Sequence, residues 1–127
     1  MVEDEDLLIA VTEVRRGPTS TDLADAPELS DWRLEAHGRN LRLHGCVSGG
    51  KAKKKSYLTT SALVAFEPDA GWARTRSRWY RLAPSWLVTN PKEREEMIAE
   101  TQSYLGRMVE TTLRSAGDQV TRPDMSA

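Results

Sequence analysis

The feature that most constrains the fold is the alternation of apolar and polar side chains between residues 31 and 47. A period of two places every second side chain on the same face of a β-strand. The alternation is interrupted by "HGRN" at residues 37–40, which is rich in turn-forming residues. The segment therefore predicts an antiparallel hairpin with a four-residue loop. One face of this hairpin would carry its apolar side chains: Trp32, Leu34, Leu41, Leu43 and Val47.

A second hairpin is predicted from residues 56–67 and 72–82, which are rich in β-branched and aromatic residues and flank the turn "PDAG". A loop at residues 68–71 places Glu67 opposite Trp72. Continued in this register, the strands send Trp79 to the core. The opposite face receives Leu82, the side chains at 57, 59, 61, 63 and 65, Tyr57 among them, and five basic or aromatic side chains of the second strand. Those five are Trp72, Arg74, Arg76, Arg78 and Tyr80.

A helix is predicted for residues 91–116. Asn90 is a favourable N-cap, Pro91 suits the first helical position and Glu93 completes a capping arrangement. Apolar residues recur at helical spacing from Met97 to Leu113, and Gly117 would end the helix.

The predicted fold is α+β, with a four-stranded antiparallel meander packed on one C-terminal amphipathic helix over residues 31–117. Residues 1–30 are predicted to form an acidic arm, with a short strand at 7–14 and a helical turn capped by Thr21 or Asp22. Residues 118–127 are expected to be a disordered tail.

Charge is unevenly distributed along the 127 residues, since residues 1–31 carry a net −7 and residues 32–86 a net +8. This asymmetry indicates either a polyanionic partner or an acidic arm that folds back on a basic body, although an ordinary solvated surface would also explain it. The single cysteine excludes an intramolecular disulfide. The acidic start and the lack of a long apolar run favour a cytoplasmic protein without a membrane span.

The stretch "HGCVSGGKAKKKS", residues 44–56, nearly matches a phosphate-binding loop. Such a loop leads into a helix, whereas the residues that follow here have a strand pattern. Ala52 also replaces the hydroxyl that would bind magnesium. We interpret the stretch as a Gly-Gly turn that leads into a cluster of lysines, namely Lys51, Lys53, Lys54 and Lys55.

Catalytic and metal-binding patterns are weak. His37, His44 and Cys46 supply three candidate ligands, whereas structural zinc usually takes four at compact spacings. A Gly-x-Ser-x-Gly nucleophile motif is missing, and the carboxylates cluster where solvation explains them. We therefore expect a non-enzymatic protein with no cofactor.

The quoted pattern from "GCVSGG" through "TTSALVAFE" to "GWARTRSRWYRL" resembles that of short bacterial proteins of unestablished activity, found in alphaproteobacteria and their phages or plasmids. The resemblance covers residues 32–83, and "GKAKKK" stands where a shorter hairpin loop is expected. It implies a small protein of mobile-element type, whose common tasks are to bind nucleic acid or to block a host machine.

Two functions follow from these patterns. The first is binding of nucleic acid or a nucleoprotein by a basic, aromatic sheet face and the lysine loop. The second is a protein-binding inhibitor of a host defence complex (anti-CRISPR-like), or an adaptor, because tryptophan, tyrosine and arginine are also frequent at protein interfaces. Both hypotheses use the same candidate residues: Lys51, Lys53, Lys54, Lys55, Trp72, Arg74, Arg76, Arg78 and Tyr80.

Overall fold

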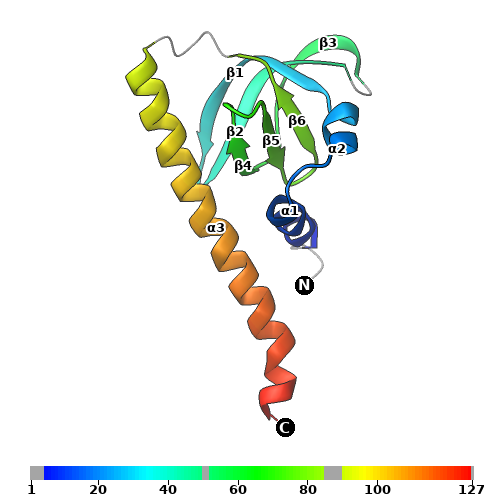
Figure 1. The fold of residues 1–127 in the computed structure, drawn as a ribbon, viewed down its shortest axis with the longest axis vertical. Helices are drawn as coiled ribbons and strands as arrows, with labels where there is room; N and C mark the ends of the chain where they lie inside the picture. Colours follow the sequence, from blue (N-terminus) through cyan, green and yellow to red (C-terminus); the bar gives the residue numbers. More distant parts are fainter. Residues whose placement is uncertain (1–4, 50–51, 85–89, 127) are drawn as a thin grey trace.

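A computed structural model describes residues 5–49, 52–84 and 90–126, with side chains described for all of these except residues 52–55 and 116–126. It contains three helices and six strands in the described residues (Figure 1). The elements are α1 (Glu5–Arg16), α2 (Ser20–Asp25), β1 (Glu28–His37), β2 (Asn40–Gly49), β3 (Ala52–Thr59), β4 (Leu63–Glu67), β5 (Trp72–Thr75), β6 (Trp79–Leu82) and α3 (Pro91–Ser126).

Helix α1 occupies the segment where a strand was predicted, so that prediction is wrong. Its apolar residues Leu7, Ala10, Val11 and Val14 recur at helical spacing, and Ala10 and Val11 are completely buried. They pack in a small cluster with Val64 of β4 and with Val109 and Leu113 of α3. The acidic segment is therefore part of the folded domain.

Helix α2 confirms the predicted helical turn, but its N-cap is Thr19. The Thr19 hydroxyl accepts a hydrogen bond from the Asp22 amide, and the Asp22 carboxylate accepts one from the Thr19 amide. This reciprocal capping box satisfies two amides at the start of the helix. The helix ends at Asp25, before Pro27.

The sheet has six strands in the order β3-β2-β1-β6-β5-β4. Two antiparallel meanders, β1-β2-β3 and β4-β5-β6, meet through a parallel pairing of β1 and β6. The α+β class and the C-terminal helix are thus confirmed, whereas a four-stranded antiparallel meander is not. The two strands predicted at 56–67 and 72–82 are each interrupted, at 60–62 and at 76–78.

The connection from β3 to β4 requires the sheet to curl. Outer strands of a flat six-stranded sheet would lie about 24 Å apart, given a spacing of about 4.8 Å. The chain from Thr59 to Leu63 spans at most about 14 Å when fully extended. Because these residues end one outer strand and begin the other, the two edges must approach each other, which gives the bent sheet of Figure 1.

The hairpin β1–β2 was predicted correctly in outline. His37 pairs with Asn40, so the loop has two residues, Gly38 and Arg39, rather than four. A register shift between Ser30 and Arg33 accompanies the positive φ of 50° at Asp31, as in a β-bulge. The five apolar residues predicted to share a face all lie in or against the main core: Trp32, Leu34, Leu41, Leu43 and Val47.

The β4–β5 register matches the prediction from Glu67↔Trp72 to Ala65↔Arg74 and then shifts to Leu63↔Thr75. In the next pair of strands, Arg74 lies opposite Trp79 and Ala73 lies opposite Tyr80. Residues directly opposite in an antiparallel pair share a face. Trp79 therefore lies on the same face as Arg74, although it is buried, as predicted. Tyr80 lies on the other face and belongs to the main core.

Helix α3 begins as predicted, because the Asn90 side-chain oxygen accepts hydrogen bonds from the amides of Lys92 and Glu93. Ile98, Thr101 and Leu105 are buried against the sheet. The helix extends to Ser126, so the predicted end at residue 116 is wrong, and residues 118–126 continue the helix where a disordered tail was expected.

Candidate functional site

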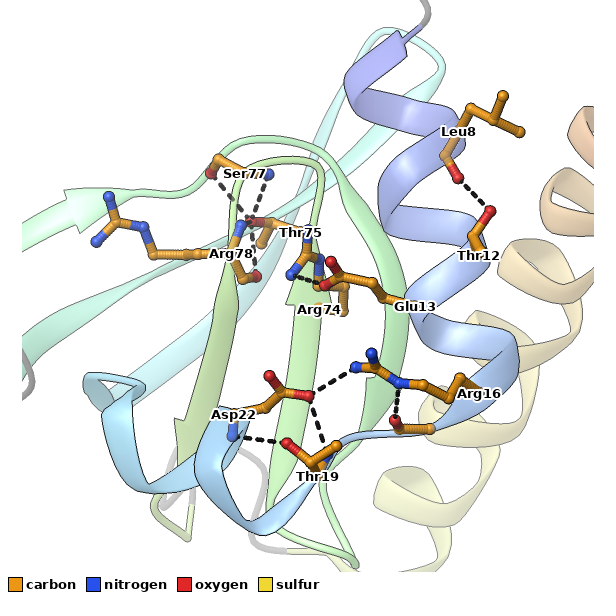
Figure 2. A network of polar contacts seen from close by, with 11 residues as sticks. Leu8, Thr12, Glu13, Arg16, Thr19, Asp22, Arg74, Thr75, Ser77 and Arg78 are labelled. Carbon is orange, nitrogen blue, oxygen red and sulfur yellow. Dashed lines mark hydrogen bonds and ion pairs between the residues drawn. The ribbon is translucent and has the colours of Figure 1, made fainter.

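The loop between β5 and β6 is built around the buried hydroxyl of Thr75. This oxygen accepts hydrogen bonds from the amides of Ser77 (3.3 Å) and Arg78 (3.2 Å), and the Thr75 amide donates to the Arg78 carbonyl (2.9 Å) (Figure 2). The Ser77 hydroxyl also bonds the Ser61 hydroxyl at 2.8 Å. The loop is therefore held from both sides, and it leaves the side chains of Ser77 and Arg78 exposed.

Arg74 lies beneath helix α1. Its side chain is 8% exposed, and its Nη1 atom lies 2.8 Å from the Glu13 carboxylate (Figure 2). Its guanidinium also lies 5.3 Å from the centre of the Trp79 ring. Burial lowers the pKa of Arg74, and the charge of Glu13 opposes that shift. The prediction that Arg74 faces solvent with Arg76 and Arg78 is wrong, because helix α1 covers this part of the strand and pairs Glu13 with Arg74.

A second ion pair lies beside the first. The Asp22 carboxylate accepts hydrogen bonds from Arg16 (2.7 Å) and from the Thr19 amide (2.9 Å). The hydrogen bond from the Thr19 backbone is the main cause that lowers the pKa of Asp22, and nearby Arg16 and Arg74 add to it. Through Glu13, the acidic segment pairs with one arginine of the basic strand, as expected for an acidic arm that folds back on a basic body.

Two adjoining hollows open beside the β5–β6 loop. The first, which we call the Arg74 hollow, has a volume of about 400 Å³ and is lined by Glu13, Asp22, Asp25, Ala26, Pro27, Arg74, Ser77, Arg78 and Trp79. The second, the Thr59 hollow, has a volume of about 310 Å³ and is lined by Pro27, Val47, Leu58, Thr59, Thr60, Ser61, Ser77, Arg78 and Tyr80. Because Pro27, Ser77 and Arg78 line both, the two hollows adjoin, and we refer to them together as the groove.

Two buried donors belong to residues that line the Arg74 hollow. Arg74 Nε and Trp79 Nε1 are shielded from solvent and have no hydrogen-bond acceptor among the described residues. Most buried polar side-chain atoms in folded proteins have a partner, so such exceptions call for an explanation.

An aromatic pair lies next to the groove. Tyr57 of β3 is 64% exposed, and its ring is stacked on His44 of β2, with 6.2 Å between ring centres and 22° between the ring planes. His44 Nδ1 in turn bonds the Thr59 hydroxyl at 3.0 Å, and Thr59 lines the Thr59 hollow. The sequence analysis did not select this pair. The signal that could have indicated it is the presence of two aromatic rings on consecutive strands that pair with each other.

The structure separates the predicted site residues. Arg78 is exposed at the groove, Arg76 is half-buried and has an interaction partner, and Trp72 is half-buried with its ring edge against Trp79, 5.4 Å between centres. Tyr80 lies in the main core, where burial raises its pKa, so the prediction that it shares the arginine face is wrong. Lys51 lies outside the described residues, and Lys53, Lys54 and Lys55 lie in β3, of which the structure describes only the backbone there.

Across the residues with described side chains, no group of three or more histidines, cysteines or carboxylates is placed to hold a metal ion. His37 bonds the Glu35 carboxylate at 3.2 Å, which lowers the pKa of Glu35.

None of the helices in the described parts of the chain is long and apolar enough to cross a membrane.

A family model matches residues 3–113. The chain belongs to a family of unknown function (DUF6634). The matched region is wider than the stretch on which the sequence resemblance rests, since it includes α1 and most of α3. It ends at Leu113, which packs in the cluster with α1. No curated protein and no solved structure matches the chain.

Proposed function

We propose that this protein is a small non-enzymatic module that binds single-stranded nucleic acid along the groove formed by the two hollows, with Tyr57 as a stacking platform at one end. This function agrees with the mobile-element type that the sequence resemblance implies. The observation that supports it most is Tyr57, a large aromatic ring that is 64% exposed on a sheet beside a groove that contains an arginine.

Exposed aromatic rings bind unpaired bases by stacking, which requires no particular base because every base has a π-face. Tyr57 is already held in position by His44, so less conformational freedom is lost when a base stacks on it. A sheet face with such rings is a common platform for single-stranded RNA and DNA.

Arg78 supplies the phosphate contact in this proposal. It is exposed on a loop fixed by Thr75, and none of the acidic groups in the described part of the chain forms an ion pair with it. The lysine-rich strand β3 carries Tyr57 itself, so further positive charge lies in the same strand. Arg74 was predicted to contact nucleic acid as well, but it has no phosphate contact in this proposal, because its charge is already paired with Glu13.

The test measures the binding of a fluorescently labelled single-stranded 12-mer by anisotropy at about 50 mM salt, and repeats it at rising salt. Tyr57→Ala should weaken binding by about 1 to 3 kcal/mol, whereas Tyr57→Phe should bind like the native protein, because the ring remains. Arg78→Ser should weaken binding and reduce the log-log salt slope by about 1, since one phosphate contact is lost. Arg114→Ser, an exposed arginine on α3, is the matched control for the loss of charge. A folded protein that binds neither DNA nor RNA at this salt concentration would contradict the proposal.

A second candidate is the protein-binding inhibitor or adaptor, which is favoured by two neighbouring apolar side chains on α1. Leu8 and Ile9 are 39% and 47% exposed and lie outside both core clusters. In this case Leu8→Ser with Ile9→Ser should abolish co-elution with a purified host defence complex, and Tyr57→Ala should not. The reverse pattern would favour the nucleic-acid module.

A further inference from the structure

We propose that the protein forms a weak homodimer, in which the outer face of α1 pairs in antiparallel orientation with the same helix of a second copy. This inference goes beyond the proposed function and does not depend on it. Its evidence is the order of side chains along that face, with an acid at the start of the helix, two aliphatic side chains in the middle and bases at the end.

The outer face of α1 consists of exposed residues that are related by steps of three or four positions, so they lie on one side of the helix. They are Glu5, Leu8, Ile9, Thr12, Arg15 and Arg16. The opposite side of the helix packs in the cluster with β4 and α3. In Figure 2, Leu8 and Thr12 project from α1 on the side away from Arg74. Helix α1 therefore has one face in the core and a second face in solvent.

The middle of the outer face is apolar. Leu8 is 39% exposed and Ile9 is 47% exposed, and neither belongs to a core cluster. The Thr12 hydroxyl beside them donates to the Leu8 carbonyl at 2.8 Å, so covering it would not leave it without a partner. An apolar centre with a charged rim is the usual composition of a protein interface.

The two ends of the outer face carry charges of opposite sign. Glu5 and Arg15 are both exposed, and neither forms an ion pair with any residue that the structure describes. Arg16 is already held by Asp22 at 2.7 Å. Because a helix rises 1.5 Å per residue, the levels of Glu5 and Arg15 are about 15 Å apart along the helix axis.

A face with this order is complementary to itself in the antiparallel orientation. A two-fold axis at the level of residue 10 places Glu5 opposite the partner's Arg15, and Leu8 level with the partner's Thr12. In a parallel pair, Glu5 would instead face the partner's Glu5, and like charges would repel. The charge order therefore favours a second copy, since an unrelated partner requires no such self-complementarity. An interface of one helix from each copy is small, so we expect a Kd of about 10 to 100 µM.

Sedimentation equilibrium of the full chain without nucleic acid tests the dimer at about 10 to 500 µM protein and about 50 mM salt, where surface charges are weakly screened. The native protein should pass from monomer to dimer over this range. Glu5→Arg and Arg15→Glu should each raise the Kd at least about tenfold, because each change creates two contacts between like charges. An equimolar mixture of these two variants should associate within about threefold of the native affinity, since both contacts again join opposite charges.

The matched controls are Glu95→Arg and Arg39→Glu, which reverse exposed charges outside α1 and should leave the dimer unchanged. Leu8→Ser combined with Ile9→Ser should abolish the dimer and leave the fold intact, which urea unfolding of each variant checks.

The proposal is overturned if the native protein stays monomeric over the whole range, if either single charge reversal dimerises as well as the native protein, or if the mixture of folded variants stays monomeric. Dimerisation of the double serine variant would also overturn it. A monomeric native protein that binds a host complex through Leu8 and Ile9 would overturn it as well, and would assign the outer face of α1 to the second candidate function.

Discussion

The ion pair between Glu13 and Arg74 provides the most specific prediction on stability. Glu13→Gln keeps a side chain of similar size and helix propensity, but it removes the negative charge that faces the buried guanidinium. Breaking a buried ion pair costs about 3 to 5 kcal/mol when one partner is deleted, because the other charge is left uncompensated. Two features reduce this value here: the Glu13 side chain is 32% exposed, and glutamine still offers a neutral acceptor.

We therefore expect Glu13→Gln to lower the free energy of unfolding by about 2 kcal/mol, which corresponds to a shift of about 1 M in the urea midpoint for a protein of this size. The matched control is Asp69→Asn, whose carboxylate is 77% exposed and pairs with Arg94 at 2.9 Å; it should cost less than about 1 kcal/mol. Adding Arg74→Met to Glu13→Gln should restore much of the loss, because it removes the unpaired charge. Equal losses for Glu13→Gln and Asp69→Asn would refute the argument that Arg74 depends on Glu13.

Three further predictions concern stability, each measured by urea unfolding. Gly45→Ala should cost about 2 to 4 kcal/mol, because a Cβ atom there would lie 2.8 Å from the Ser30 carbonyl oxygen and 3.0 Å from Trp32 Cα, and neither is free to move; a loss under about 0.5 kcal/mol would contradict this. Asn90→Ala should lower the free energy of unfolding by about 1 kcal/mol because the α3 cap is lost, whereas Asn90→Asp should keep most of the stability that the cap provides. Burial, with the neighbouring charge of Asp69, raises the folded-state pKa of Glu67 above 4.5. The ionisation of Glu67 therefore destabilises the fold as the pH rises from 4.5 through the folded-state pKa. Glu67→Gln should stabilise the protein at pH 7 and make no difference below about pH 4, and a gain that is independent of pH would contradict this.

Local signals in the sequence predicted the elements that depend on local interactions. The Asn90 cap and the following proline located the start of α3 correctly, because the amides of a first helical turn are satisfied by residues a few positions away. The alternation around residues 37–40 likewise predicted the β1–β2 hairpin and the five apolar residues of its inner face. These signals need no knowledge of the rest of the fold.

The errors arose where distant parts of the chain decide the structure. The run Leu7–Val14 is short and apolar enough to suit a strand, and its helical spacing has meaning only once α3 and β4 are present to cover it. The interruption at residues 60–62 has no glycine or proline to mark it, and it is imposed by the need to join the two edges of a curled sheet. Missing both features also misplaced Arg74, whose face α1 covers, and Tyr80, whose face follows the altered register.

The symmetric strand order has a consequence for how the chain folds. Each meander consists of neighbouring strands joined by short connections, so each can form with little loss of loop entropy. The parallel contact that unites them pairs Leu29 with Leu82, from opposite ends of the strand region. Closing that long loop costs the most conformational entropy. The closed arrangement is stabilised by Trp32, which donates its indole N–H to the Ala83 carbonyl at 2.6 Å. The slow event in refolding is therefore expected to be the docking of two preformed halves. Substitutions of seam contacts that form during docking should lower the refolding rate, and substitutions within either meander should leave the unfolding rate nearly unchanged, because the meanders are already formed in the transition state.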